Sequence, residues 1–477
     1  MKQGKLKRNG SLGLMLVLMF SVVLSACSGG SNTSTTGSSQ TGSGGTTETA
    51  ATTDGTNLIT TAQVPAGSDL EKALKGEYKG TKVTMYGPFV DADEQKFNAS
   101  IKAFEDATGI DIAYEGSKEF EATINVRVNG GNAPDIADFP QPGLLENFAK
   151  AGKVVDVSTF IDADYMKKQY KQSWLDMGQM AGPDNKDITA GVWARSSVKS
   201  LVWYNKKAFD EAGYTVPKTW DDMMKLTEQI AADGDPAWSI GIESGAATGW
   251  PATDWVEDIM LRTTTPENYD KWVKGELPFT DPIVKNAVEK MSEIWFNKDY
   301  VYGGRSSIAT TNFGDAIAPL FTDPPKAWLH RQAGFITSFI PEGVKPEDYD
   351  WFPFPSIDEK YGTPAMISGD IYAMFNDRPE VRAAMEFFTT AESLQSWIKS
   401  GGVTPPMNGT PDDWFANDQE RRMSEFVQTA KTIRFDGSDL MPSAVGAGTF
   451  WKGMTDYVSG TADLDQAMQE IQAGWKK

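Results

Sequence analysis

An alternation of strand-like and helix-like segments at the start of the globular part most constrains the fold. In GTKVTMYGPFVDADEQKFNASIKAFEDATGIDIAYEGS, Val83 and Met85 alternate with polar residues, which predicts a half-buried strand. Phe97, Ile101 and Phe104 then stand at i, i+4 and i+7, which predicts an amphipathic helix that stops at the glycine before IDIAYE. IDIAYE alternates again, so the segment predicts a β-α-β unit with parallel strands.

A third strand is predicted further along. The stretch EFEATINVRVNGGNAPDIADFPQP indicates a helix, a Gly-Gly stop and a strand that ends near Phe139. In parallel sheets with helical crossovers, ligands bind at the carboxyl ends of the strands. The side chains expected at those ends are Asp91, Asp93, Glu94, Glu115, Glu119, Asp138, Phe139 and Gln141.

The globular part is about 400 residues long, beyond the size at which one hydrophobic core keeps growing, so we expect two lobes. In the second set of elements, Thr219 is expected to cap a helix whose inward stripe begins at Trp220 and reaches Ile230. Further helices are predicted after Pro282 and Pro379 and at the end of the chain.

Charge and composition exclude several classes of function. The net charge is −20, which argues against nucleic acid and against an acidic membrane surface as partners. A single histidine, His330, removes most chemistry that relies on imidazole, such as Ser-His-Asp triads, Cys-His pairs and zinc sites with several His ligands. The 15 tryptophans beside many carboxylates suit polyhydroxylated ligands, which are held by stacking and by charge-assisted hydrogen bonds.

The N-terminus predicts export and a lipid anchor. A positive opening precedes an apolar run over residues 14–24, too short for a spanning helix, and Leu24-Ser25-Ala26-Cys27 resembles a bacterial lipobox. The resemblance implies a signal peptide over residues 1–26 and acylation of Cys27, the only cysteine. The alternative is an ordinary secreted protein with a stray cysteine.

Residues 27–77 are predicted to be the lipidated cysteine and a flexible Ser/Thr/Gly tether, because such a segment buries too little apolar surface to offset its ordering entropy. The expected location is the extracellular face of the cell membrane. A single-membrane cell fits best, and a diderm periplasm stays open.

Several segments resemble the solute-binding proteins of ABC sugar importers, the maltose-binding-like family. AFEDATGIDIAYE, GNAPDIADFPQPGLLENFAKAGKVVDV, VWYNKKAFDEAG, PKTWDDMMKL and FNDRPEVRAAMEFFTTAES stand in the family's order. DPPKAWLHRQAGFI, SGDIYAMFNDRPEVR and FDGSDLMPSAVGAGTFWKGM are similar to the branch that binds α-glucosides. The resemblance implies two α/β lobes with a hinge of crossing strands, the first over 78–192 and 362–402 and the second over 193–361 and 403–477.

The resemblance also implies sugar-contacting residues at the strand ends of the first lobe. Phe139 and Gln141 match a strand-end segment that touches sugar, and ordinary core is the equal alternative for Phe139. Asp91 matches a sugar-contacting acid of the family. The alternatives are a helix N-cap and a calcium-binding loop, although the spacing of an EF-hand is absent. Glu119 lies in the loop after the second strand, where it could equally be a solvated helix end.

Further site residues are implied around the hinge and in the second lobe. Arg195 could bind hydroxyls or form a structural ion pair, and Asp370 at a crossing strand requires a partner. Trp250 matches an aromatic platform and Asp323 a turn that borders the sugar, whereas Trp238 and Trp255 are expected in the core.

The firmest matches are Met441 and Trp451, at the ten-residue interval of the family's "MP…FW" element, with Met lining the pocket and Trp stacking on a sugar ring. Asn312, His330 and Arg331 are expected to be structural.

The predicted function is capture of an α-linked di- or oligosaccharide outside the cell and its delivery to an ABC importer permease. We expect no catalytic residue, cofactor or metal, a monomer, and membrane contact through the lipid anchor only. The rival class is a secreted glycoside hydrolase, since carboxylate pairs abound. A third class is a receptor for peptides or anions. A basic pocket would favour this class, and Arg195 is the only candidate residue for one.

Overall fold

The structure, a computed structural model, describes residues 64–476. The predicted signal peptide, Cys27 and the tether up to residue 63 lie outside the described residues. The strands are β1 (Lys82–Gly87), β2 (Asp111–Gly116), β3 (Ile136–Phe139), β4 (Gln179–Ala181), β5 (Asp187–Thr189), β6 (Val192–Val198), β7 (Leu201–Asn205), β8 (Leu329–Arg331), β9 (Tyr349–Pro353), β10 (Ala365–Met374) and β11 (Ile433–Phe435).

The α-helices follow the predicted alternation and then dominate the second half of the chain. They are α1 (Asp69–Leu74), α2 (Asp91–Thr108), α3 (Phe120–Asn129), α4 (Pro142–Lys150), α5 (Ala163–Gln169), α6 (Gln172–Met177), α7 (Lys206–Ala212), α8 (Trp220–Asp233), α9 (Trp250–Thr263), α10 (Pro266–Val273), α11 (Pro282–Trp295), α12 (Arg305–Ile308), α13 (Pro379–Phe388), α14 (Gln395–Ser400), α15 (Asp418–Thr429), α16 (Gly437–Leu440), α17 (Trp451–Ser459) and α18 (Leu464–Ala473).

The predicted β-α-β-α-β start is confirmed. Strand β1 pairs in parallel with β2 on one side and with β3 on the other, and α2 and α3 are the crossovers. Phe97, Ile101 and Phe104 are buried on one face of α2, and Gly109 ends this helix with a φ of 71°. Local periodicity alone therefore specified this half of the sheet.

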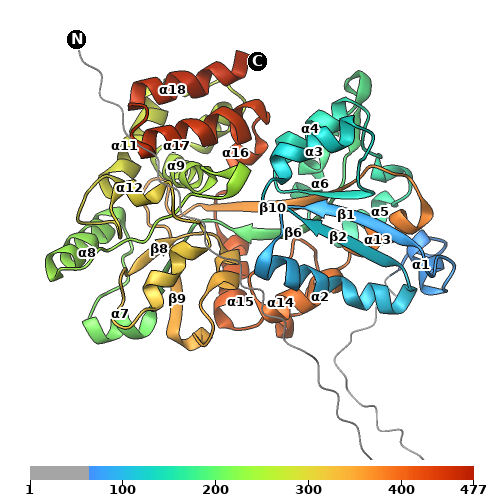
Figure 1. Cartoon of the computed structure of the whole chain (residues 1–477), viewed down its shortest axis with the longest axis horizontal. Helices are drawn as coiled ribbons and strands as arrows, with labels where there is room; N and C mark the ends of the chain where they lie inside the picture. Colours follow the sequence, from blue (N-terminus) through green and yellow to red (C-terminus); the bar gives the residue numbers. More distant parts are fainter. Residues whose placement is uncertain (1–63, 477) are drawn as a thin grey trace, which may run out of the picture. The chain divides into compact units, whose positions relative to one another are not determined.

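Two crossing strands join the first lobe to the second. Strand β10 pairs antiparallel with β6 along most of its length, and its end also pairs antiparallel with β3. Its start pairs in parallel with β11. Figure 1 shows β6 and β10 running from the region of β1 and β2 to the region of α9 and α11. The hinge is thus a pair of hydrogen-bonded strands and not a flexible loop.

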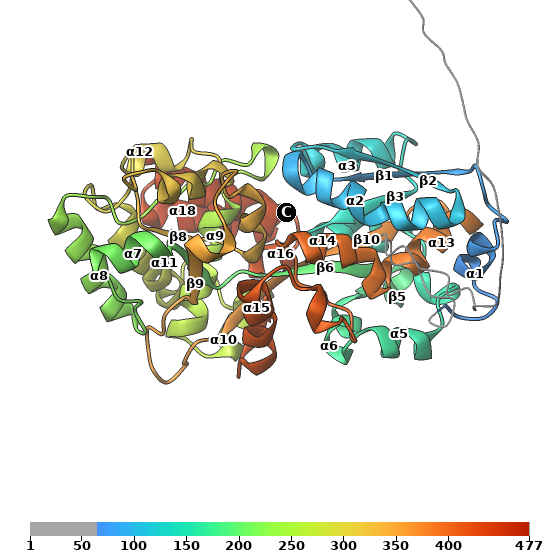
Figure 2. The ribbon, with the colours of Figure 1, turned by 90° about the horizontal axis from the view of Figure 1, so that it is seen from below.

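The second lobe packs helices around a small antiparallel sheet in which β7 lies between β8 and β9. Helix α8 confirms its prediction: Thr219 Oγ1 accepts a hydrogen bond from Asp222 N at 3.2 Å, and Gly234 ends the helix at a φ of 106°. Its stripe from Trp220 to Ile230 is buried. In Figure 2, α15 lies beside β9, and Arg422 of α15 pairs with Asp350 of β9.

Each lobe has its own hydrophobic core. The first-lobe core draws on residues 70–194 and 367–435, and the main second-lobe core on residues 202–366 and 441–471, beside a smaller cluster that includes Trp203, Leu320 and Trp351. Val403, Met407 and Trp414 pack in the first core, beyond the predicted boundary at 402. They do so because the chain after α14 returns along the first lobe, where Thr404 bridges to Ser196 of β6.

The predicted tether over 27–77 needs correction at its end, because α1 is a helix docked on the first lobe. Ser68 caps it, and its apolar residues Leu70 and Ala73 are fully buried. Glu386 of α13 accepts a hydrogen bond from Leu70 N at 2.6 Å. Two buried residues and a capped turn are enough to order the segment just before β1.

None of the helices within residues 64–476 combines the length and apolar character needed to cross a lipid bilayer.

We predict that Trp238→Ala lowers the free energy of unfolding by about 3–5 kcal/mol and leaves ligand affinity unchanged. The indole is 0% exposed, packs edge-on against Trp255 at 5.3 Å, and donates to Thr227 Oγ1 at 3.0 Å. Denaturant melts give the measurement, with the exposed Tyr302→Ala as control. A loss below about 1 kcal/mol for Trp238→Ala would contradict a core role.

Candidate functional site: a cleft at the hinge

A cleft of about 170 Å³ lies between the two cores, at the carboxyl ends of β1, β2 and β3. Residues that follow each of these strands line it, as parallel sheets with helical crossovers lead one to expect. The lining residues are Pro88, Phe89, Val90, Asp91, Asp93, Ser117, Lys118, Glu121, Pro140, Gln141, Arg195, Ser197, Lys199, Ser244, Ala247, Trp250, Asn312, Phe313, Phe335, Phe339, Ser368, Gly369, Asp370, Asp439 and Trp451.

The crossing strands form the floor of the cleft. Arg195 and Ser197 of β6, and Lys199 just after it, line the cleft at every second position. This spacing follows from the strand geometry, which sends successive side chains to opposite faces. Asp370 stands opposite Arg195 in the antiparallel register of β6 and β10. The hinge and the cleft therefore share side chains.

Arg195 is the cation at the first-lobe end of this floor. Its Nε donates to Asp370 Oδ2 at 2.6 Å, and its Nη1 lies 3.5 Å from Asp93 Oδ2 on α2. The guanidinium also lies over the rings of Phe89 and Trp397, 4.2 and 4.7 Å from their centroids. Aromatic faces and two carboxylates offset the cost of burying this charge.

A buried carboxyl group lies behind this pair. Asp138 of β3 is fully buried, and neither of its oxygens has a hydrogen-bond donor among the described residues. Burial raises the pKa of Asp138 well above its ordinary value, and the negative charge of Asp370 raises it further. Burial therefore favours the protonated form of Asp138, and Arg195 is held by Asp370 and Asp93.

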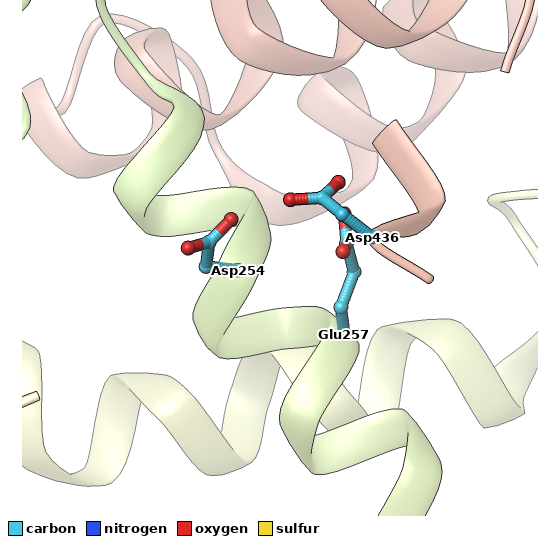
Figure 3. Close-up of side chains that lie close together, drawn as sticks. All are labelled: Asp254, Glu257 and Asp436. Carbon is cyan, nitrogen blue, oxygen red and sulfur yellow. The ribbon is translucent and has the colours of Figure 1, made fainter. Parts of the chain in front are cut away.

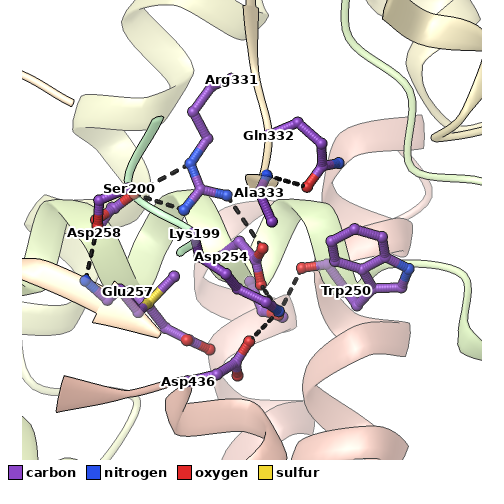
Figure 4. A network of polar contacts seen from close by, with 12 residues as sticks. Lys199, Ser200, Trp250, Asp254, Glu257, Asp258, Arg331, Gln332, Ala333 and Asp436 are labelled. Atoms are coloured by element: carbon purple, nitrogen blue, oxygen red, sulfur yellow. Dashed lines mark hydrogen bonds and ion pairs between the residues drawn. The ribbon is translucent and has the colours of Figure 1, made fainter. Parts of the chain in front are cut away.

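Lys199 is the cation at the second-lobe end. Its Nζ lies 3.0 Å from Asp254 Oδ1, 3.9 Å from Asp439 Oδ2, and in direct hydrogen-bond contact with Asp436. Figure 4 shows Lys199 between Asp254 and Asp436. Burial acts to lower the pKa of Lys199, but the surrounding carboxylates outweigh it and raise the pKa well above its ordinary value. The lysine stays charged.

Asp254, Glu257 and Asp436 bring one oxygen each within 4.8 Å of one another, and Figure 3 shows their carboxylates converging. All three are engaged by donors of the protein. Asp254 and Asp436 accept from Lys199, and Glu257 accepts from the backbone N–H groups of Gly437 and Ser438 at 2.9 and 3.0 Å. Lys199 thus supplies the positive charge that this cluster needs.

A second basic residue extends the network away from the cleft. Arg331 Nη1 donates to Asp254 Oδ2 at 3.1 Å, and its Nε donates to Asp258 Oδ2 at 3.1 Å. Figure 4 shows Arg331 between these two carboxylates. The structural role expected for Arg331 fits this position, as it does for His330, whose Nδ1 lies 2.8 Å from Ser239 O.

Aromatic rings form the second-lobe wall. The ring of Trp250 lies 5.2 Å from Phe313 and 5.8 Å from Phe335, both edge-on, and Lys199 Nζ lies 4.9 Å from the Trp250 centroid. Trp451, 2% exposed, donates from Nε1 to Ser438 Oγ at 3.3 Å. These rings offer flat apolar faces beside charged acceptors.

The structure brings six of the ten predicted site residues to the cleft. They are Asp91, Gln141, Arg195, Trp250, Asp370 and Trp451. The partner required for Asp370 is Arg195. The cap alternative for Asp91 is not favoured, because α2 has no side-chain cap hydrogen bond and Asp91 pairs instead with Lys118 at 3.2 Å.

The other four predicted residues do not line the cleft. Phe139 is fully buried in the first core among Phe120, Phe148 and Phe375, the alternative that the sequence left open. Met441 is buried in the second core, so its side chain packs under the cleft wall. Glu119 and Asp323 are exposed.

Lys199, Asp439, Phe313 and Phe335 line the cleft but were not predicted there, and Asn312, expected to be structural, lines it too. The signal for Lys199 was its position four residues after Arg195, in extended chain just beyond β6, which puts both side chains on one face. For Asp439 the signal was its place within FDGSDLMP, two residues before Met441.

The two lobes touch across the cleft mouth. Ala246 N in η3 (Gly245–Ala247) donates to Lys118 O of the first lobe at 3.3 Å. Lys96 Nζ of α2 donates to Ser338 Oγ in η5 (Gly334–Phe339) at 2.9 Å, and Asn147 Nδ2 of α4 donates to Ser443 Oγ at 2.7 Å. The structure is therefore that of a closed cleft.

Two discontinuous α/β lobes that close over a polar and aromatic cleft at a strand hinge define a solute-binding protein. Residues 91–395 match the family described as bacterial extracellular solute-binding protein. The chain belongs to this family, and the resemblance seen in the sequence is confirmed.

Two curated relatives cover most of the chain. "Osmoprotective compounds-binding protein GgtB" of Synechocystis is 43% identical over 404 residues, 85% of this chain and 94% of GgtB. "Alpha-glucosides-binding periplasmic protein AglE" of Rhizobium meliloti is 41% identical over 416 residues, 86% of this chain and 90% of AglE. The crystal structure of the bacterial solute receptor AcbH superposes with a TM-score of 0.70 at 19% identity, covering 83% of this chain and 98% of AcbH, and shows the shared fold.

We predict that Gly143→Ala holds the cleft open. A Cβ at Gly143 in α4 would lie 1.9 Å from Met441 O, a backbone atom of the other lobe. Displacing a backbone atom costs more free energy than rotating a side chain, so we expect the lobes to separate while each core stays intact. Small-angle X-ray scattering should report a larger radius of gyration than that of the wild type.

The matched control is Gly178→Ala, where the added Cβ meets its nearest neighbours at ordinary contact distances of 3.5 and 3.6 Å. Superimposable scattering curves for Gly143→Ala and Gly178→Ala would contradict a closed wild-type cleft.

Proposed function

We propose that this protein captures an α-linked glucoside of two or more sugar units in the hinge cleft and delivers it to the permease of an ABC importer, without catalysis. One observation carries the proposal: the cleft combines aromatic faces with buried acceptors that lack donors. Gln141 Oε1 and Asp93 Oδ1 are buried and have no hydrogen-bond partner among the described residues. Sugar hydroxyls supply donors for such atoms, and sugar rings stack on such faces as those of Trp250 and Trp451.

The name of one relative supports this ligand class, and the name of the other gives a second candidate. AglE is an α-glucosides-binding protein, and GgtB binds osmoprotective compounds. A small polyhydroxylated osmoprotectant is therefore the second candidate ligand. Both ligands would use the same hydroxyl-to-carboxylate contacts, so they differ in size rather than in the chemistry of recognition.

The rival classes find less support in the cleft. Glycoside hydrolysis needs one carboxylic acid and one free carboxylate on either side of a glycosidic bond. Asp370 is instead committed to Arg195 at 2.6 Å. A receptor for anions needs free cations, whereas Arg195 and Lys199 are each surrounded by carboxylates of the protein. Capture and release of an unchanged solute suits these groups better.

The lipobox supports attachment to the outer face of the membrane through Cys27, which lies outside the described residues. The chain is acidic, with a net charge of −20 over its full length, so it offers no electrostatic attraction to an anionic surface. Acyl chains on Cys27 would then be the main hold on the membrane, and the Ser/Thr/Gly segment that follows would let the binding lobes reach both solute and permease.

We predict that a bound α-glucoside stabilises the protein and is recovered unchanged. At a hundred times its dissociation constant, maltose, trehalose or sucrose should raise the free energy of unfolding by about 2.7 kcal/mol through mass action. Trp451→Ala should weaken binding by roughly 2–4 kcal/mol, because it removes one aromatic face of the cleft. Calorimetric titration and thermal melts measure both effects.

Trp238→Ala is the matched control in the same assay, since it removes a buried indole from the same lobe but away from the cleft. Wild-type affinity in Trp451→Ala would sink the assignment of that ring. New reducing ends in the trehalose or sucrose samples, with loss of the thermal shift, would favour the hydrolase.

We predict that Cys27→Ala releases the protein from membranes and leaves sugar binding intact. Removing the thiol removes the site of acylation, and a single change in residues 1–63 does not alter the cleft. Fractionation of cells that express the full chain measures the distribution. Retention of the variant in the membrane fraction would rule out the lipid anchor.

A further inference from the structure

The cleft carries more acidic than basic side chains. Five of its lining residues are carboxylic acids: Asp91, Asp93, Glu121, Asp370 and Asp439. Three are cations: Lys118, Arg195 and Lys199. The next layer behind the floor adds Asp254 and Asp436, which are buried and accept hydrogen bonds from Lys199.

Each of the three cations is already paired within the protein. Arg195 lies between Asp370 and Asp93, and Lys199 lies among three aspartates. Lys118, at the rim, pairs with Asp91 at 3.2 Å. None of these three cations is therefore left without a carboxylate partner in the protein and free to bind a negatively charged ligand.

The buried polar atoms of the cleft that lack a hydrogen-bond partner in the described part of the chain include two acceptor oxygens, one on Gln141 and one on Asp93. Gln141 is 5% exposed, its Nε2 lies 3.4 Å from Glu121 Oε1, and its Oε1 has no donor among the described residues. Asp93 Oδ1 is in the same situation. A buried acceptor without a donor costs free energy, which a ligand hydroxyl or ammonium group recovers. A carboxylate on the ligand brings only more acceptors.

We propose that the cleft selects its ligand by charge, accepting neutral and amino-bearing glycosides and rejecting glycosides that carry a carboxylate or a phosphate. This inference rests on the proposed function and narrows its substrate class. The selection acts because a ligand carboxylate or phosphate that enters the cleft loses its hydration and meets only cations that are already paired with aspartates of the protein. It requires no additional contact to the sugar ring.

The test uses derivatives that change charge but not shape. Maltose, trehalose and sucrose are titrated first. The tightest of the three is then compared with its 6-amino-6-deoxy, 6-uronate and 6-uronamide derivatives by calorimetry at one pH and ionic strength. The uronate and the uronamide have the same shape and differ in charge, so their ratio of dissociation constants isolates the charge effect from steric fit.

We expect the uronate to bind at least about tenfold more weakly than the uronamide, and the amino derivative to bind at least as tightly as the uronamide. Equal binding of uronate and uronamide would overturn charge selection and leave the proposed function standing. If none of the three parent sugars binds, the proposed function fails and the inference fails with it.

A pair of protein variants localises the effect. Asp91→Asn removes the rim carboxylate that pairs with Lys118, so the uronate-to-uronamide ratio should shrink by about two- to fivefold, the scale of an exposed ion pair. Asp111→Asn is the matched control: Asp111 is similarly exposed and pairs with Lys82 at 4.0 Å, but it does not line the cleft. An equal change in both variants would show that net charge, and not the cleft, sets the selection.

Discussion

The ion pair between Arg195 and Asp370 is the interaction on which the hinge and the cleft both depend. It joins β6 to β10 at the point where the two strands cross between the lobes, in a register that places the two residues directly opposite each other. A buried pair of this kind adds little net stability, yet loss of one partner leaves an uncompensated charge and costs about 3–5 kcal/mol. The pair therefore acts mainly to fix the register of the hinge, and Asp93 ties the same guanidinium to α2.

In the second lobe, the ion pairs of Lys199 fix the positions of neighbouring elements in the same way. It gathers carboxylates from α9, from the residue after β11 and from α16 around one ammonium group. Glu257 holds the start of α16 through two backbone N–H groups. Because these elements are fixed before a ligand arrives, the second-lobe wall loses little conformational entropy on binding. Each lobe thus presents a rigid face, and the main freedom left is rotation about the crossing strands.

The fold was predictable where periodicity is local and one-sided. Helices α2 and α8 each bury one face, and β1 alternates between exposed and buried residues over Lys82–Met85, so the sequence shows these patterns directly. The site was less predictable because β3 and β6 are buried at every position, so no alternation tells which face meets the cleft. Phe139 was assigned to the cleft, and Lys199 was missed, for this reason.

The ion pairs of the site could not be predicted, because their partners lie far apart in the sequence. Arg195 meets Asp370 across 175 residues, and Lys199 meets Asp436 across 237, and no local pattern encodes such partners. The ten-residue interval from Met441 to Trp451 was matched to the family's element, but it contains the π-helical segment η9 (Ala444–Phe450). This segment turns Met441 into the second core while Trp451 lines the cleft.

Three hydrogen bonds join the lobes when the cleft is closed, and none of them uses a residue of the cleft floor. The hydrogen bonds from Ala246 N, Lys96 Nζ and Asn147 Nδ2 join the lobes at the mouth and flanks. Each is worth about 0.5–1.5 kcal/mol net, so together they bias the hinge without locking it. A ligand that touches both walls must supply the remaining free energy, since a ligand shifts an equilibrium only by its differential affinity for the two states. Because one of these contacts is between backbone groups and none uses a floor residue, the floor and walls can change their ligand preference while the closing motion stays the same.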